Sequence, residues 1–322
     1  MQKQLATWQL INSSLEQHIP VMLLYVLQSE GSSPGRAGFL MALNAAGQME
    51  GSIGGGIMEH KFVEMVKEQL QQHTAAISVR RQIHNKHAAK NQSGMICSGE
   101  QTILLYPVRD ADTGPVQQII RCLQQHQYGV LHLSPAGFRF EPEAVSEPTH
   151  ELTMISSSDW YYRGAIGYRQ HLHIVGAGHC ALALSALMNK LDFYVHVYDD
   201  RPGLHTLLQN TFAHAQYTLG DYSELAEKIP SGHQHYVVVM TVGYRTDDIA
   251  VRALLNKTLR YFGILGSKSK ITSMFDGYLE EGIPGKQLST IYAPVGLPIN
   301  SHTPEEIAIS IAAEIIAVKN RP

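Results

Sequence analysis

Cysteine is scarce in this sequence of 322 residues, which contains three: Cys97, Cys122 and Cys180. Their spacing matches neither a zinc site nor a disulfide framework, so we expect free thiols in a reducing cytoplasm. No apolar run reaches membrane-spanning length, and the N-terminus lacks the basic and apolar segments of a signal peptide. The formal net charge of −3 gives no reason to expect nucleic acid or a membrane surface as partner.

Several enzyme motifs are also missing. The sequence contains no His-Glu-x-x-His and no obvious pair of carboxylates for acid–base chemistry. The glycine-rich stretch GSIGGGIMEH at residues 51–60 is not followed by Lys-Ser or Lys-Thr, which excludes a Walker A loop. These absences favour a binding protein without turnover over an enzyme, although they leave catalysis open.

Histidine, in contrast, occurs 17 times. The pairs His171/His173 and His233/His235 are each two residues apart, which puts both side chains of a strand on one face and makes a metal pair geometrically feasible. No cysteine or carboxylate lies nearby to complete a ligand set. Surface or strand-edge histidines are therefore the preferred interpretation.

The hydrophobic pattern divides the chain into three parts. Residues 1–108 mix helices and strands, and residues 109–168 are predicted to be a connector with some structure. In residues 169–322 strands and helices alternate, which predicts a parallel sheet wrapped by helices. For the first part we expect helices over 5–17 and 57–72 and strands over 21–28, 39–43, 76–84 and 101–106. For the last part we expect strands over 171–175, 194–198, 236–241 and 262–265 and helices over 179–190, 247–259, 270–281 and 304–318.

A dinucleotide-binding fingerprint begins the last part. Gly176-x-Gly178-x-x-Ala181 follows a predicted strand and opens a helix whose first residue is His179. The helix start offers free N–H groups to a pyrophosphate, and Asp199, 23 positions after Gly176, ends the next strand where a ribose hydroxyl would be held. The alternative is a packing turn that binds nothing.

The glycine run of the first part is a second candidate anion site. Gly54, Gly55 and Gly56 lead into a helix that carries Glu59, whose carboxylate can accept ring N–H donors of a pterin. The alternative is a β-bulge with a sharp strand-to-helix turn. Further polar groups are candidates for ligand contact in nearby or similar loops: Ser33 and Arg36 of GSSPGRAG, and Ser267 with Lys268 of GSKSK.

Longer stretches of the chain carry a resemblance. They are GSSPGRAG, GSIGGGIMEHKFVE, MICSGEQTILLYPV, VGAGHCALALSAL, DDRP, YFGILGSKSK and APVGLPINSHTPEEIAISIAAEIIA. In this combination the chain resembles the XdhC/CoxI family, the accessory factors of xanthine dehydrogenase and carbon-monoxide dehydrogenase. The resemblance implies the fold class α/β, with an N-terminal α/β XdhC/CoxI domain and a C-terminal Rossmann-like doubly wound parallel sheet.

The resemblance also implies a function. Such a factor binds the molybdenum cofactor (molybdopterin), protects it during sulfuration, works with a cysteine desulfurase and delivers it to apo-xanthine dehydrogenase or a related molybdenum hydroxylase. Three positions depart from the family pattern: Ser98 after Cys97, Val242 where histidine is frequent, and Asn300 after Ile299. The missing histidine leaves the identity of the bound molecule open.

Cys97 is the cysteine best suited to this function. A thiolate in the loop SGMICSGE would coordinate molybdenum or carry sulfur, provided that its pKa is low; the alternative is a small buried hydrophobe. Cys180 opens the fingerprint helix, whose dipole would favour a thiolate. Cys122, in QQIIRCL, is predicted to lie in the core.

Three functions stay open. The first is the cofactor chaperone, and the second is an NAD(P)-dependent oxidoreductase, for which no general acid or substrate-orienting arginine can be assigned. The third is a nucleotide-binding regulatory module in which helix 304–318 and the first domain form a partner or homodimer surface. Because both glycine motifs suit an anion, we also expect the two domains to close on one ligand.

Overall fold

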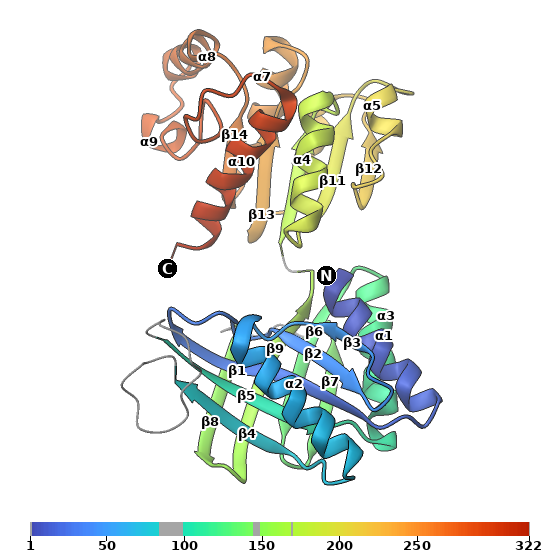
Figure 1. The fold of residues 1–322 in the computed structure, drawn as a ribbon. Coiled ribbons are helices and arrows are strands. Elements are labelled where there is room, and N and C mark those ends of the chain that lie inside the picture. Colours follow the sequence, from blue (N-terminus) through green and yellow to red (C-terminus); the bar gives the residue numbers. More distant parts are fainter. Residues whose placement is uncertain (1, 84–98, 144–148, 169, 322) are drawn as a thin grey trace. The chain divides into compact units, whose positions relative to one another are not determined.

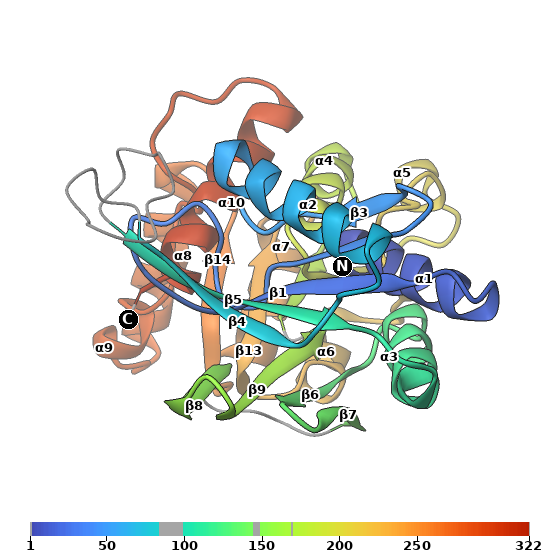
Figure 2. The ribbon, with the colours of Figure 1, turned by 60° about the horizontal axis from the view of Figure 1, so that its bottom comes forward.

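The computed structural model describes residues 2–83, 99–143, 149–168 and 170–321. The chain forms two compact units, Met1–Gly167 and Tyr168–Pro322, which are drawn in Figures 1 and 2 and described separately here. Among the described residues, no helix combines the length and the apolar character that crossing a bilayer requires.

Unit 1 contains an antiparallel five-stranded sheet with strand order β3-β2-β1-β5-β4. The predicted hairpin is present, since β2 pairs with β3. The strands are β1 (Val21–Gly31), β2 (Leu40–Asn44), β3 (Met49–Gly51), β4 (Ser78–Ile83) and β5 (Gly99–Pro107). The accompanying helices are α1 (Gln2–Glu16) and α2 (Gly56–Gln71).

Successive side chains of a strand point to opposite faces of a sheet, and β1 buries its side chains on both faces. Met22, Leu24 and Val26 of β1 pack against α2, which contributes Phe62 and Val66. The other face of β1 packs into a larger core with α1 and with residues of the predicted connector. The apolar run of β1 is thus explained by burial on both sides.

The segment 109–168 was expected to form a connector with some structure, but its residues up to Gly167 belong to unit 1 and contribute to this larger core. They fold into a helix and an antiparallel sheet of order β7-β6-β9-β8. Trp160, Tyr162 and Ile166 alternate along β9 and face the core. Cys122 is 3% exposed there, as predicted. The elements are η1 (Asp110–Asp112), α3 (Thr113–Gln124), β6 (Tyr128–Ser134), β7 (Gly137–Pro142), β8 (His150–Ser156) and β9 (Asp159–Gly167).

Unit 2 is built on a parallel five-stranded sheet with strand order β12-β11-β10-β13-β14. Its strands are β10 (His171–Val175), β11 (Tyr194–Asp199), β12 (Ala215–Thr218), β13 (Gly232–Val239) and β14 (Leu259–Ile264). Its helices are α4 (His179–Lys190), α5 (His205–Leu208), η2 (Tyr222–Glu224), α6 (Leu225–Lys228), α7 (Tyr244–Leu254), α8 (Lys268–Glu280), α9 (Gly285–Leu288) and α10 (Pro304–Lys319).

Helices cover both faces of the parallel sheet. One face packs against α4 and α10, whose Ile311 and Ile315 are fully buried, and the other packs against α6, α7 and α8. This is the doubly wound Rossmann-like arrangement, so the predicted fold class is confirmed. The predicted bounds of β10 and α4 are correct, whereas the helix predicted over 247–259 begins three residues earlier and ends five residues earlier.

His171, His173 and His235, three of the four histidines that suggested metal pairs, cluster with His196 on one face of this sheet, whereas His233 is exposed. His173 and His235 are buried, so the interpretation as surface histidines is wrong for these two. His173 lies beside His196 in the β10–β11 register, with ring centroids 4.4 Å apart, and its two ring nitrogens contact Tyr198 Oη at 3.0 Å and His235 Nδ1 at 2.9 Å. His171 Nδ1 lies 3.1 Å from His196 Nε2. Among the described residues, no group of three or more His, Cys, Asp and Glu side chains has the geometry of a metal site.

Candidate functional site

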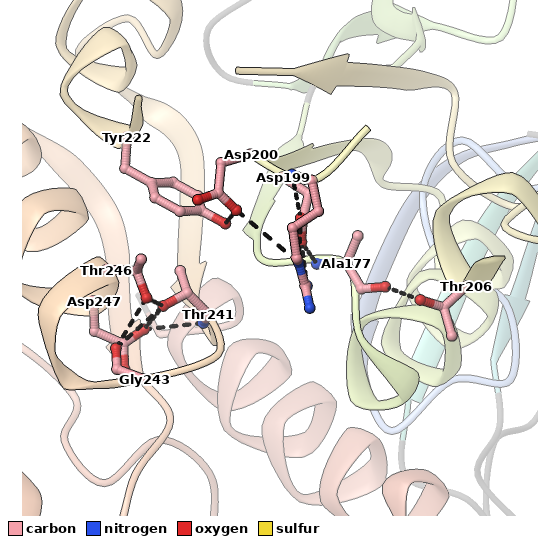
Figure 3. A network of polar contacts seen from close by, with 10 residues as sticks. Ala177, Asp199, Asp200, Thr206, Tyr222, Thr241, Gly243, Thr246 and Asp247 are labelled. Atoms are coloured by element: carbon pink, nitrogen blue, oxygen red, sulfur yellow. Dashed lines mark hydrogen bonds and ion pairs between the residues drawn. The ribbon is translucent and has the colours of Figure 1, made fainter. Parts of the chain in front are cut away.

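The carboxyl edge of the unit 2 sheet carries the fingerprint loop. In an open parallel sheet, ligands bind outside the carboxyl ends of the strands where the strand order reverses, which here is between β10 and β13. The two loops meet closely, because a Cβ added to Gly176 would lie 2.3 Å from Met240 O. Gly176 also has a φ of 105°, so this position requires glycine. Figure 3 shows the polar groups of both loops.

Asp199 holds the fingerprint loop from one side. Its carboxylate accepts hydrogen bonds from the Ala177 N–H at 2.7 Å, the Arg201 N–H at 3.0 Å, and the Arg201 Nε and Nη2 atoms at 2.8 and 2.7 Å. The Thr206 hydroxyl donates to the Ala177 carbonyl from the other side (Figure 3). Asp199 is 0% exposed. The residue expected to hold a ribose hydroxyl is therefore occupied by the protein itself.

The charge of Asp199 is compensated inside the site. Burial alone would raise its pKa, but the hydrogen bonds from Arg201 and from the Ala177 amide hold the pKa below its usual value. The bond to Asp199 raises the pKa of Arg201 in turn. Asp200, the next residue, stays partly exposed and accepts a hydrogen bond from Tyr222 Oη at 3.1 Å.

A second buried carboxylate, Asp247, organises the β13–α7 loop. It accepts hydrogen bonds from the Thr241 N–H at 2.9 Å and the Thr241 hydroxyl at 2.6 Å, and it forms an ion pair with Lys270. The Thr246 hydroxyl lies 2.5 Å from that of Thr241. Like Asp199, Asp247 is 0% exposed. Each of the two carboxylates accepts a hydrogen bond from a loop amide, forms an ion pair with a cation and so fixes a loop beside the switch point.

Gly178 and His179 of the fingerprint are accessible, whereas Ala181 is buried in the core as its packing role predicts. A Cβ added to Gly178 would meet no atom within 4 Å, and Gly178 precedes the first helical residue, His179, which is exposed. Burial, and then the charge of Glu305, raise the pKa of the Cys180 thiol. This direction is opposite to the lowering of the thiol pKa that the helix dipole alone would produce.

The GSKSK turn follows β14 at the same edge of the sheet. Ser267 caps α8, since its hydroxyl accepts a hydrogen bond from the Lys270 N–H. Lys268 is exposed as the first residue of α8. The side chain of this turn that contacts the switch point is Lys270, through Asp247.

In unit 1, Glu59 occupies the glycine run. Its Oε2 atom accepts hydrogen bonds from the Ser52 hydroxyl at 2.7 Å and from the Ile53 and Gly55 N–H groups, both at 2.9 Å. The anion at these amides is therefore a side chain of the chain itself. Gly54, Gly55 and Gly56 have φ angles of 134°, 76° and 71°, as a sharp strand-to-helix turn requires.

The GSSPGRAG loop packs directly on this turn. A Cβ added to Gly35 would lie 2.1 Å from Ile53 O. The Ser33 hydroxyl donates to the Gly35 carbonyl at 3.3 Å, and the exposed Arg36 donates to the Gly31 carbonyl at 3.0 Å. The structure thus brings Ser33, Arg36 and the glycine run together, whereas Cys97 lies outside the described residues.

Sequence reasoning missed four residues that shape the carboxyl edge: Arg201, Thr206, Asp247 and Lys270. Arg201 stands in the motif DDRP, where an adjacent acid and base signal a local ion pair. Asp247 and Lys270 are 23 positions apart, and neither belongs to a short motif. In these loops the two buried carboxylates are each paired with a cation, and the start of α4 at Gly178 and His179 stays accessible, which suits binding of an anionic ligand.

Comparison with known proteins gives matches over both units. A family model described as the XdhC Rossmann domain matches residues 172–315, and one described as the XdhC and CoxI family matches residues 14–81. The first match contains β10 to β14 and the loops of the carboxyl edge, and the second contains both glycine loops of unit 1.

Two curated relatives and one solved structure resemble nearly the whole chain. The uncharacterized protein YqeB of Escherichia coli is 24% identical over 95% of this chain, which spans 44% of that protein's length. A probable xanthine dehydrogenase subunit of Bacillus subtilis is 23% identical and is matched over 97% of both chains. A crystal structure described as a xanthine dehydrogenase from Bacillus halodurans has the same fold, with a TM-score of 0.72, 22% identity and coverage of 98% of this chain and 97% of that one.

Proposed function

Because this chain belongs to the XdhC and CoxI family, we propose that it is an accessory factor of a xanthine dehydrogenase. In this function it binds the molybdenum cofactor as cargo, protects it during sulfuration and delivers it to the apo-enzyme. The name of the B. subtilis relative, a probable xanthine dehydrogenase subunit, supports this choice of client.

The observation that carries the proposal is the open glycine loop at the switch point. Asp199 and Thr206 hold the N–H and the carbonyl of Ala177, so the loop keeps its shape without a ligand. Gly178, directly beyond it, has free space above its backbone. The phosphate of the cofactor would contact this loop, because N–H groups at a helix start attract anions.

The neutralised carboxylates make an anionic cargo acceptable here. Asp199 is paired with Arg201 and Asp247 with Lys270, so two buried acids near the loop add little net negative charge. The alternative ligand, a nicotinamide dinucleotide, would find the buried Asp199 already bonded to four donors. This favours the chaperone over the oxidoreductase.

Cys97 lies outside the described residues, and its role at the cargo stays a proposal that the family resemblance implies. A thiolate at Cys97 would coordinate molybdenum or carry the sulfur that a cysteine desulfurase supplies.

Equilibrium binding of isolated molybdenum cofactor, NAD(H) and NADP(H) to the full chain tests the proposal. Gly178 has φ −71°, so any residue fits its backbone. Gly178→Asp puts a carboxylate at the phosphate position and should weaken cofactor binding by about a hundredfold, whereas Gly178→Ala should weaken it by less than about threefold.

Cys97→Ala should weaken cofactor binding, with Cys122→Ala, which changes a buried thiol of α3, as its control. Equal binding by the wild type and Gly178→Asp would contradict the site. Tight nicotinamide binding without cofactor binding, with turnover of small carbonyl substrates, would replace the proposal with the oxidoreductase.

A further inference from the structure

The two sides of the switch point differ in what they offer a ligand. On the β11 side, both oxygens of Asp199 are bonded: Oδ1 to the Arg201 N–H and Nε, and Oδ2 to the Ala177 N–H and Arg201 Nη2. A ribose diol needs a free carboxylate oxygen as acceptor, and Asp199 provides none. A nucleotide in the usual Rossmann orientation therefore loses its main ribose contact.

On the β13 side, the polar groups turn inward and apolar groups turn outward. The Thr241 hydroxyl donates to Asp247, and the Thr246 hydroxyl lies beside that of Thr241. Between these two threonines in the sequence, Val242 is 71% exposed and Tyr244 is 46% exposed. A Cβ added to Gly243, the residue that separates these two side chains, would meet no atom within 4 Å.

The β13–α7 loop lies directly against the fingerprint loop. Gly176 approaches Met240 O and Thr241 Cα so closely that an added Cβ would lie 2.3 and 2.9 Å from them. An apolar side chain and an aromatic ring beside an open glycine make a surface on which a planar heterocycle can lie. Its phosphate would then reach the fingerprint loop from the β13 side.

We propose that the ligand of unit 2 is a planar heterocycle with a terminal phosphate, whose ring lies on Val242 and Tyr244 and whose ribose, if it has one, is not recognised. This inference rests on the proposed function and specifies how the pterin of the cargo is oriented. Val242, which departs from the family's frequent histidine, is then a specificity-determining contact for an uncharged ring face.

The β11 side provides matched controls. Leu208, at the end of α5, is 71% exposed, the same fraction as Val242. Asp200 is the remaining partly exposed carboxylate that follows β11, and it would be the acceptor for a ribose diol if a nucleotide bound in the usual orientation. Substitutions at Leu208 and Asp200 therefore report on the β11 side alone.

The experiment measures quenching of pterin fluorescence with 6-hydroxymethylpterin monophosphate as the probe, and 6-hydroxymethylpterin and NAD+ as comparisons. The Kd of the phosphorylated probe should rise about tenfold in Val242→Ser and in Tyr244→Ser. It should change by less than about twofold in Leu208→Ser and Asp200→Asn, and the unphosphorylated probe should bind about tenfold more weakly than the phosphorylated one.

The outcomes separate this inference from the proposed function. Binding that weakens in Leu208→Ser or Asp200→Asn but not in the β13-side variants would overturn the orientation and leave the cofactor function standing. Equal weakening by variants on both sides would also overturn it. NAD+ binding tighter than the pterin phosphate, or no pterin binding by the folded wild type, would overturn both.

Discussion

Acid should destabilise unit 2 through the histidine cluster of its sheet. Burial, followed by repulsion from His235, lowers the pKa of His171 to about 4. Burial, followed by His171 and other histidines, lowers the pKa of His196 to about 3. In the unfolded chain both should titrate near the ordinary value of 6.5. The perturbation is therefore a shift from pH 7.5 to pH 5.

The sign and size follow from proton linkage. Below pH 6.5 the unfolded state binds protons that the folded state does not bind. The free energy of unfolding therefore keeps its full value above pH 6.5, and it falls as the pH decreases toward about 4 for His171 and about 3 for His196. At pH 5 each of His171 and His196 removes about 2 kcal/mol, or about 4 kcal/mol together. His173, whose pKa burial lowers well below 6.5, acts in the same direction.

Hydrogen exchange of the full chain, read by mass spectrometry and corrected for intrinsic rates, can resolve this loss. Both tryptophans, Trp8 and Trp160, belong to unit 1, so tryptophan emission does not report on unit 2. Protection of β10 and β11 peptides should fall about a thousandfold between pH 7.5 and pH 5. Asp199, whose pKa lies below its usual value, contributes only at lower pH.

Two phenylalanine variants test the cause. His196→Phe should reduce the pH slope of stability by about 1.4 kcal/mol per pH unit, because it removes one titrating group. His233→Phe changes an exposed histidine of β13 and should leave the slope unchanged. Unchanged protection of β10 from pH 7.5 to pH 5, or equal slopes in both variants, would refute the reasoning.

Three further substitutions have calculable effects on stability. Gly35→Ala should destabilise unit 1 by about 2–4 kcal/mol, because its Cβ would meet Ile53 O at 2.1 Å. The assay is urea unfolding monitored by tryptophan emission. The control Gly114→Ala in α3 has open space and should be neutral or stabilising, and equal costs for the two variants would contradict the reasoning. Glu59→Ala leaves two loop amides without their acceptor and should cost about 1–3 kcal/mol in the same assay; a neutral result would mean that solvent replaces the carboxylate. Asp199→Ala should cost unit 2 about 3 kcal/mol, measured by tyrosine near-UV circular dichroism during melting, and a loss below about 1 kcal/mol would show that the ion pair is dispensable.

The regular part of the chain could be predicted well from its pattern. β10 and α4 have the expected bounds, because a buried strand, a glycine turn and a helix follow one another without ambiguity. The helix α7 begins at Tyr244, three residues before its predicted start at Asp247. The carboxylate of Asp247 accepts the Thr241 amide, and Gly243 precedes the helix without a side-chain cap, so no capping residue marks the true start in the sequence. Leu259 was assigned to this helix but begins β14.

The sheet formed by β6 to β9 was hidden for a different reason. In β9 (DWYYRGAIG) three aromatic residues stand in a row and a glycine occupies one of the inward positions, so the period-two alternation is obscured. The candidate site was predictable where a short motif carried it, as at Gly176 and Gly178. It was not predictable where contacts cross the sheet, because the pairing of Asp247 with Lys270 depends on how two distant loops meet.

The carboxylates at the glycine loops have a thermodynamic consequence. Glu59, Asp199 and Asp247 each bind backbone amides of a strand-to-helix loop. The conformational entropy of these loops is therefore lost when the chain folds, and little remains to be lost when a ligand binds there. Binding of a ligand at these loops, such as the proposed cofactor, should then involve small backbone movement, so its affinity would depend on the few contacts made to the ligand itself.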